Sequence, residues 1–259
     1  MTMPEGSNLR TLWRHPFDSN LLIVNQLYKS VFLLDKKTKT TKRIFDSLST
    51  FTKITALELI DSDKILVGKN DCPFVSLIEF NPNFDEEVKF RCLDNARLVI
   101  SKMLDPMKID CHGIAVCNQE RDFVVSVGSR YTLTLDSILC GKILNKKTKL
   151  RVLRRMDLRK RLGHRLFPVY AFQIIVSKRV PSKFIFVGIP YLILNRRTSK
   201  LSELIFFCYD YELGKITHLG EKKIGLKRCL RMVVCEGNES AMVVDNAANL
   251  VSVELKLPP

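Results

Sequence analysis

Short apolar runs separated by turn residues dominate the hydropathy pattern of the chain, and helical periodicity is confined to one basic segment. The runs are rich in Val, Ile, Leu, Phe and Thr, which suits a pleated, half-buried strand. We therefore expect strands at 21–25, 30–34, 54–59, 64–68, 74–80, 113–117, 122–127, 131–135, 172–176, 183–187, 203–209, 231–235, 241–244 and 250–255.

The expected strands recur in sets, and the part that repeats most clearly within the chain is the junction between the third and fourth strand of a set. Residues 32–39 match residues 207–214, with Asp35 and Asp210 at equivalent places. Asp or Asn opens such a turn because its side chain can accept hydrogen bonds from the backbone two residues on. A Gly or small polar residue then takes the left-handed position. Weaker copies of the junction lie at 80–83 and 135–142.

These sets define about five four-stranded units, and the fifth set lacks an outer strand. We expect residues near Leu9 to Trp13 to supply that strand from the other end of the chain. If this closure fails, the open edge invites pairing, and the protein needs a strand from a partner. The units run over 9–46, 54–90, 95–142, 168–219 and 227–256.

Four-stranded units of this size resemble the blades of a β-propeller. The segment His112-Gly113-Ile114-Ala115-Val116 is similar to the start of an NHL-type blade, and residues 210–215 resemble the hairpin that closes WD40-type blades. The WD dipeptide and the GH signature are absent. The resemblance implies an all-β, β-propeller-like fold forming a single domain over 1–259; a β-sandwich is the structural alternative.

Composition and charge narrow the class of protein. Hydrophobic residues make up 46% and charged residues 27% of the 259 residues, which excludes wholesale disorder. Against 27 Asp and Glu stand 42 Lys and Arg, giving a formal net charge of +15. Such a balance favours acidic partners, whether protein or nucleic acid.

Most of this charge lies in one segment, residues 142–166, which we interpret as a basic insertion or connector. Between Lys142 and Arg165, eleven Lys or Arg face only Asp157. If residues 150–162 are helical, their apolar positions form a narrow stripe that ends at Gly163. The candidate contacts to a nucleic acid or another polyanion are Lys146, Lys147, Lys149, Arg151, Arg154, Arg155, Arg159, Lys160, Arg161 and Arg165.

Three roles suit this basic segment. It can contact nucleic-acid phosphates, serve as a nuclear localisation signal, or meet an acidic protein or membrane surface. No Phe, Tyr or Trp lies between Tyr131 and Phe167, so platforms for stacking single-stranded bases are locally absent. A solvated face without a ligand is the fourth interpretation.

No catalytic, cofactor or metal signature accompanies the strands. The chain lacks GxGxxG, GxxxxGK[ST], HExxH and GxSxG. His112 beside Asp110 allows a hydrolase or lyase only if a further carboxylate converges on them. Cys111, His112 and Cys117 lack the fourth ligand of a structural zinc site. We expect no enzyme activity, cofactor or metal, and we expect the eight cysteines to be mostly core thiols.

The N-terminal residues and the apolar runs indicate in which cellular compartment to expect the protein. The N-terminal residues show no basic region followed by an apolar stretch, and the longest apolar run, 184–194, is too short to cross a bilayer. We expect an intracellular protein, cytoplasmic or nuclear, without membrane insertion. The sequence favours a non-enzymatic interaction module of a larger assembly, binding a protein partner through propeller loops and an acidic surface through the basic segment. RNA or DNA binding through 142–165 is the alternative.

Overall fold

The computed structural model describes strands and turns over most of the chain, and no helix occurs in the ranges it describes. Within that part of the chain, no helix is long and apolar enough to span a membrane. The described residues are 9–14, 18–26, 30–46, 54–70, 72, 74–84, 89–98, 109–117, 121–129, 134–144, 148–157, 169–176, 183–190, 203–223, 229–234, 240–245 and 250–254.

The strands form five sheets, which we name A to E in chain order. Sheet A holds β1 (Leu9–Arg14), β2 (Leu21–Gln26), β3 (Ser30–Asp35) and β4 (Thr41–Asp46). Sheet B holds β5 (Ile54–Asp61), β6 (Lys64–Lys69), β7 (Phe74–Phe80) and β8 (Phe90–Arg97). Sheet C holds β9 (Ile109–Cys117), β10 (Asp122–Ser129), β11 (Thr134–Leu144) and β12 (Lys149–Asp157). Sheet D holds β13 (Val169–Val176), β14 (Lys183–Pro190), β15 (Glu203–Asp210) and β16 (Lys215–Lys223). Sheet E holds β17 (Cys229–Val234), β18 (Ser240–Asp245) and β19 (Leu250–Glu254).

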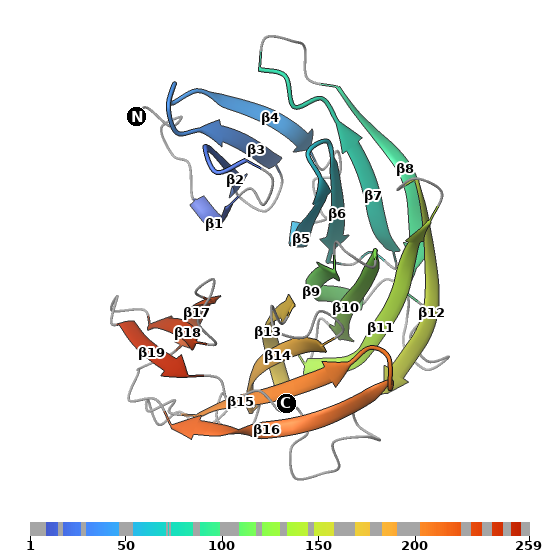
Figure 1. Ribbon diagram of the computed structural model, residues 1–259, viewed down its shortest axis with the longest axis vertical. Coiled ribbons are helices and arrows are strands. Elements are labelled where there is room, and N and C mark those ends of the chain that lie inside the picture. Colours follow the sequence, from blue (N-terminus) through green and yellow to red (C-terminus); the bar gives the residue numbers. More distant parts are fainter. Residues whose placement is uncertain are drawn as a thin grey trace.

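Every sheet is built from consecutive antiparallel strands in chain order. The sheets stand around a common centre, with the first strand of each nearest the middle and the last at the rim (Figure 1). This is the β-propeller arrangement that the repeated strand sets predict, and it excludes two packed sheets of a sandwich.

Both faces of sheet B are buried between its neighbours, which explains its continuous apolar runs. Ile65 and Val67 pack with sheet A, whereas Leu66 packs with sheet C, because successive side chains of a strand point to opposite faces. Phe45 of sheet A meets Phe90 of sheet B edge to face, with ring centroids 5.2 Å apart. The buried Lys42 adds a hydrogen bond from its ammonium to the Asn83 carbonyl across the same boundary.

The two matched hairpins have the geometry that their sequences predict. Asp35 Oδ1 accepts hydrogen bonds from the backbone N–H of Lys37 at 2.7 Å and of Thr38 at 3.3 Å. The Lys37 N–H in particular holds the pKa of Asp35 below its ordinary value. Lys39 then takes the left-handed conformation, with φ 58°.

The same arrangement closes sheet D. Asp210 Oδ1 accepts from the Leu213 N–H at 2.9 Å, and Gly214 has φ 61°. The weaker copy at 80–83 also forms a turn, in which Asn81 Oδ1 accepts from the Asn83 N–H at 2.9 Å. The prediction that Asp or Asn opens the turn is confirmed at all three places, because each turn relies on a local side-chain acceptor. The expected Gly in the left-handed position occurs in sheet D, whereas in sheet A this position is taken by Lys39, which is neither Gly nor a small polar residue.

Three expectations from the sequence are wrong. Residues 135–142 form no turn but lie inside β11, and Gly141 within them serves a close approach between strands. Residues 150–157 belong to the strand β12 and not to a helix. Residues near Leu9 to Trp13 do not complete the fifth sheet, because β1 already pairs with β2 in sheet A. Sheet E has three strands in the described residues.

Candidate interaction surface

The strand β12 carries most of the described part of the basic segment, on the outer rim of sheet C. It pairs with β11, and its exposed Lys149 and Arg151 alternate with Leu150 and Val152, which pack against the core between sheets B and C. Because successive side chains of a strand point to opposite faces, the two cations lie on the face away from this core, and both are exposed. Leu153, displaced by a bulge in the pairing, is 48% exposed beside them.

Sheet B anchors the start of β12. The strand lies beside β8, the rim strand of sheet B (Figure 1). Asp94 on β8 accepts a hydrogen bond from the Leu150 N–H at 2.8 Å through Oδ2. Because the acceptor is a carboxylate, its hydrogen bond to a backbone N–H of the edge strand β12 is stronger than a bond between neutral groups, and it strengthens the contact between β8 and β12. This contact holds the backbone between Lys149 and Arg151 in place.

A third basic residue of β12, Arg154, is turned toward sheet D. Arg154 Nη1 lies 3.4 Å from the Tyr211 carbonyl oxygen, to which it donates. The guanidinium covers Gly214 so closely that a Cβ there would lie 1.9 Å from Nη1. Arg155 is half-buried. Lys149, Arg151 and Arg154 are thus exposed, and Arg154 and Arg155 have contacts within the protein.

A polar cluster joins sheets C and D next to Arg154. Tyr211 donates its hydroxyl to the Gly141 carbonyl oxygen at 3.1 Å. Burial, with the Asp122 carboxylate nearby, raises the pKa of Tyr211. Asp122 is itself 6% exposed and lies 3.6 Å from Lys142 Nζ through Oδ1. Burial also raises the pKa of the Cys140 thiol to about 11, so this thiol is protonated near neutral pH and is no activated nucleophile.

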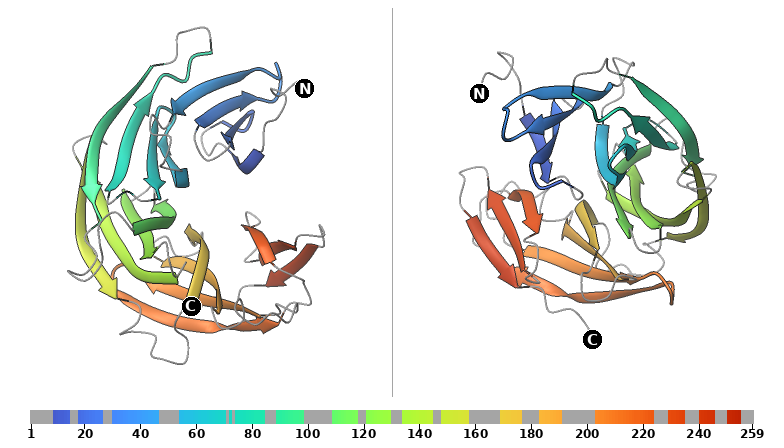
Figure 2. Two further views of the ribbon diagram at one scale, coloured as in Figure 1. Left: turned by 180° about the vertical axis from the view of Figure 1, so that it is seen from behind. Right: turned by 45° about the horizontal axis from the view of Figure 1, so that its top comes forward.

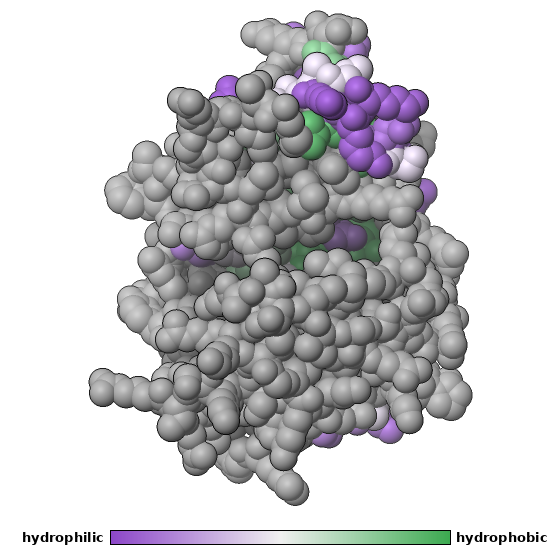
Figure 3. Space-filling model, turned by 90° about the vertical axis from the view of Figure 1, so that its left-hand side faces the viewer, coloured by the Kyte–Doolittle hydropathy of each residue, from purple (hydrophilic) through white to green (hydrophobic). Residues whose placement is uncertain are grey.

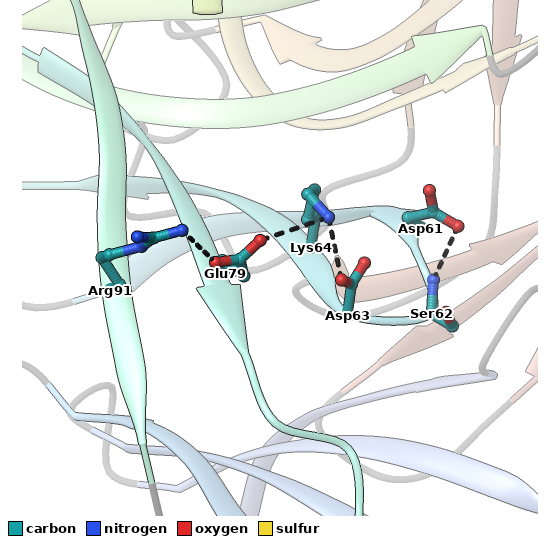
Figure 4. A network of polar contacts seen from close by, with 6 residues as sticks. All are labelled: Asp61, Ser62, Asp63, Lys64, Glu79 and Arg91. Atoms are coloured by element: carbon teal, nitrogen blue, oxygen red, sulfur yellow. Dashed lines mark hydrogen bonds and ion pairs between the residues drawn. The ribbon is translucent and has the colours of Figure 1, made fainter. Parts of the chain in front are cut away.

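A second polar network crosses the end of sheet B (Figure 4). Lys64 Nζ lies 2.8 Å from Asp63 Oδ2 and 3.4 Å from Glu79 Oε1, and Arg91 Nη2 lies 2.7 Å from Glu79 Oε2. Burial alone would raise the pKa of Glu79, but Arg91 and Lys64 together hold it below its ordinary value. The network ties the β5–β6 turn to β7 and β8, and its charges are mutually compensated.

One acidic residue has a strongly shifted pKa. Glu58 lies on β5 between Ala56 and Ile60, both members of the core between sheets B and C. Burial raises the pKa of Glu58 to about 8. A shifted carboxyl is a candidate acid or base only beside a second reactive group. None of the described contacts gives Glu58 such a partner.

The remaining predicted site residues have mixed outcomes. Of the ten predicted polyanion contacts, four lie on β12: Lys149, Arg151, Arg154 and Arg155. The other six lie outside the described residues: Lys146, Lys147, Arg159, Lys160, Arg161 and Arg165. The side chains of Asp110 and His112 on β9 are not described either. No group of three potential metal ligands among His, Cys, Asp and Glu occurs in the described part.

None of the six described cysteines forms a disulfide bond, and four of the six are buried. The expectation of core thiols is confirmed for Cys111, Cys117, Cys140 and Cys208, whereas Cys92 is exposed.

The sequence did not indicate the contacts of Asp94 and Tyr211 with the basic strand. Asp94 lies 56 residues from its partner Leu150, and Tyr211 lies 57 residues from Arg154, so no local pattern points to either contact.

Five sheets of consecutive antiparallel strands around one centre define the class of this protein, a β-propeller-like all-β protein. Comparison with solved structures agrees. The chain is similar to the β-propeller domain of Cps50 (Swd1) from Myceliophteria thermophila, with a TM-score of 0.56 and 9% identity. The match covers 96% of this chain and 71% of that chain. No protein-family description and no curated protein matches the sequence.

Proposed function

We propose that this protein is a non-enzymatic interaction module of a larger intracellular assembly, cytoplasmic or nuclear, and that β12 contacts an acidic surface of a protein partner. The observation that carries the proposal is the exposed pair Lys149 and Arg151. Both face outward from a strand whose other face is fixed on the core. The propeller fold supports the proposal because it offers rim and loop surfaces without requiring a reaction.

The pair suits a protein surface for two reasons. Both side chains are exposed and form no ion pair with the described residues, so binding an acidic group breaks no internal ion pair of theirs. Leu153 also lies exposed on the same strand, and an apolar side chain within a charged rim is typical of protein interfaces. Nucleic-acid phosphates would use the two cations and leave Leu153 uncovered.

A charge-reversal pair tests the proposal. The variant K149E/R151E is expected to lower the affinity for the assembly in extracts of the source cells at least tenfold, with an unchanged melting temperature. The matched control, K36E/K37E, makes the same charge change at two exposed lysines of the β3–β4 turn in sheet A. Equal loss of affinity in both variants would indicate a general effect of net charge and would contradict a specific role of β12.

RNA or DNA binding through the same strand remains a second candidate, favoured by the exposed cations along an extended rim. It predicts that log affinity falls linearly with log salt concentration, with a slope of several units. Titrations with single-stranded RNA, duplex DNA and heparin distinguish the two candidates. Tight binding to one nucleic acid above heparin, lost in K149E/R151E, would replace the protein partner by a nucleic acid.

A further inference from the structure

The rim of sheet C and the β15–β16 turn of sheet D, residues 211–214, form one continuous surface. The turn lies beside β12 at the edge of the molecule (Figure 1 and the left panel of Figure 2). Arg154 donates to the Tyr211 carbonyl oxygen and covers Gly214. Tyr211 in turn donates to the Gly141 carbonyl oxygen on β11. Because side chains of both sheets hold the turn, it presents its outward side chains to solvent in a fixed place.

Leu213 is an apolar side chain at the tip of this turn. It is 75% exposed, the highest value among the large hydrophobic side chains in the described part of the chain. Its backbone is fixed, because Asp210 Oδ1 accepts a hydrogen bond from the Leu213 N–H at 2.9 Å. A single exposed leucine is common on protein surfaces and by itself indicates no partner. What distinguishes Leu213 is the positive charge beside it on β11 and β12.

Two cations next to the turn stand opposite each other on neighbouring strands. Lys142 on β11 pairs with Arg151 on β12, so their side chains lie on the same face of sheet C, where like charges destabilise the pairing. The Asp122 carboxylate, whose Oδ1 lies 3.6 Å from Lys142 Nζ, compensates Lys142. Arg151 is exposed and forms no ion pair with the described residues. A carboxylate bound at Arg151 would therefore relieve a repulsion within the sheet.

Positive charge alone does not distinguish this place from the rest of the surface. Hydrophilic described residues also gather over sheet A (Figure 3), where the β3–β4 turn exposes Lys36, Lys37 and Lys39. None of the large hydrophobic side chains exposed in the described part belongs to that turn. At the boundary of sheets C and D, cations and an exposed leucine occur together. This combination favours a protein ligand, because a polypeptide supplies both carboxylates and apolar side chains, whereas a phosphate backbone supplies charge alone.

We propose that the surface formed by Lys142, Arg151, Arg154 and Leu213 binds an acidic segment of a partner protein that also carries an apolar side chain. The inference rests on the proposed function, and it adds the chemistry of the partner and a second contacting element, the β15–β16 turn. Glu212 is exposed in this turn and repels carboxylates from it. The acidic residues of the segment therefore lie over β11 and β12, and its apolar side chain lies on Leu213.

Binding of two designed peptides to the full chain tests the proposal. One peptide is a run of Glu with two Leu near its centre, and the other has Ser in place of both Leu, so that the two carry the same charge. Fluorescence anisotropy is expected to show at least tenfold tighter binding of the Glu–Leu peptide. L213S is expected to remove most of this difference with an unchanged melting temperature, because the side chain is exposed. F74S changes another exposed hydrophobic side chain, on β7 in sheet B, and as the matched control should keep the difference.

The variant R151E tests the charged half of the surface. It turns the like-charge pair with Lys142 into an opposite-charge pair, so the melting temperature of the free chain should stay the same or rise. Its affinity for the Glu–Leu peptide is expected to fall at least tenfold. K37E reverses the charge of an exposed lysine in sheet A and should change this affinity less than threefold. A lower melting temperature in R151E would mean that Arg151 serves the fold, which contradicts the proposed role.

The outcomes separate this inference from the proposed function. If neither peptide binds, or if L213S binds the Glu–Leu peptide as tightly as the wild type, the inference is wrong, and K149E/R151E still decides on the contact between β12 and the assembly. If K149E/R151E also keeps its affinity for the assembly, both proposals are wrong. Tighter binding of an oligothymidylate of the same charge, lost in R151E, would replace the acidic segment by a nucleic acid and overturn the inference.

Discussion

At the scale of the single residue, Gly141 shows how closely the strands of sheet C approach. A Cβ at this position would lie 2.4 Å from Cζ of Phe123 and 2.5 Å from the backbone oxygen of Arg151. Phe123 is fully buried, and the Arg151 oxygen belongs to the strand paired with β11, so neither atom can yield without moving the sheet. The position requires glycine because of space and not because of a turn.

The variant G141A is therefore expected to destabilise the protein by about 1–3 kcal/mol, the usual cost of overpacking a filled core. Urea denaturation followed by circular dichroism measures the loss. T217A, an exposed substitution on β16, serves as the control and is expected to change the stability by less than about 0.5 kcal/mol. A G141A protein as stable as the wild type would show that β11 and β12 can separate at little cost.

Glu58 gives a prediction on pH. In the folded protein its pKa is raised from 4.5 to about 8, so the folded state keeps the proton to higher pH than the unfolded chain. The stability associated with protonation is complete below about pH 4.5 and is lost as the pH rises through about 8. We expect the wild type to lose ~2 kcal/mol relative to E58Q over this window, since one pKa unit corresponds to about 1.4 kcal/mol and the side chain retains some hydration. Thermal unfolding of both proteins from pH 5 to pH 9 checks it. Parallel curves would mean that Glu58 is ionised in the folded state.

At the scale of the element, the contact between sheets C and D depends on the turn that follows β15. Tyr211 from this turn reaches across to the Gly141 carbonyl on β11, and Arg154 from β12 covers Gly214 of the same turn. Contacts in both directions fix the hairpin of sheet D on the rim of sheet C. The hairpin was predictable from the sequence, but its docking place was not.

The variant Y211F removes the hydroxyl that bonds Gly141 and is expected to cost about 1 kcal/mol, which lowers the melting temperature by a few degrees. T217A, the exposed substitution on β16, serves as the control and should change the melting temperature little. Differential scanning calorimetry compares the two variants with the wild type. An unchanged melting temperature in Y211F would show that the hydrogen bond to Gly141 contributes nothing at this boundary.

What the sequence could predict was what local chemistry determines. The hairpins at Asp35 and Asp210 were predictable because an aspartate accepts backbone N–H groups two and three residues on. The strands of sheet B were predictable because burial on both faces produces continuous apolar runs. The helix considered for 150–162 does not form over 150–157, and the strand was not recognised there because a bulge at Leu153 breaks its alternation. The neighbours of β12 were beyond prediction, since they lie more than fifty residues away.

At the scale of the whole molecule, the described sheets form a ring that is open between sheets A and E (Figure 1), and this makes the sheets unequal. Sheets B, C and D are each flanked on both sides, whereas sheet A packs on sheet B and sheet E packs on sheet D. In a closed ring every sheet has two neighbours, and the core between each pair contributes to the stability of both. Among the described residues, the two end sheets each bury one face against a neighbouring sheet.

Local unfolding should therefore begin at the ends of the ring. Regions with fewer buried apolar contacts open with a smaller free energy than the global unfolding. In the free chain at low urea, we expect the amides of β3 and β18 to exchange faster than those of β10, by at least one order of magnitude. Native-state hydrogen exchange at increasing urea measures the opening free energy of each sheet. If β3 and β18 opened only with the global transition, together with β10, the five sheets would behave as one cooperative unit, and the open ring would be as stable at its ends as in its middle.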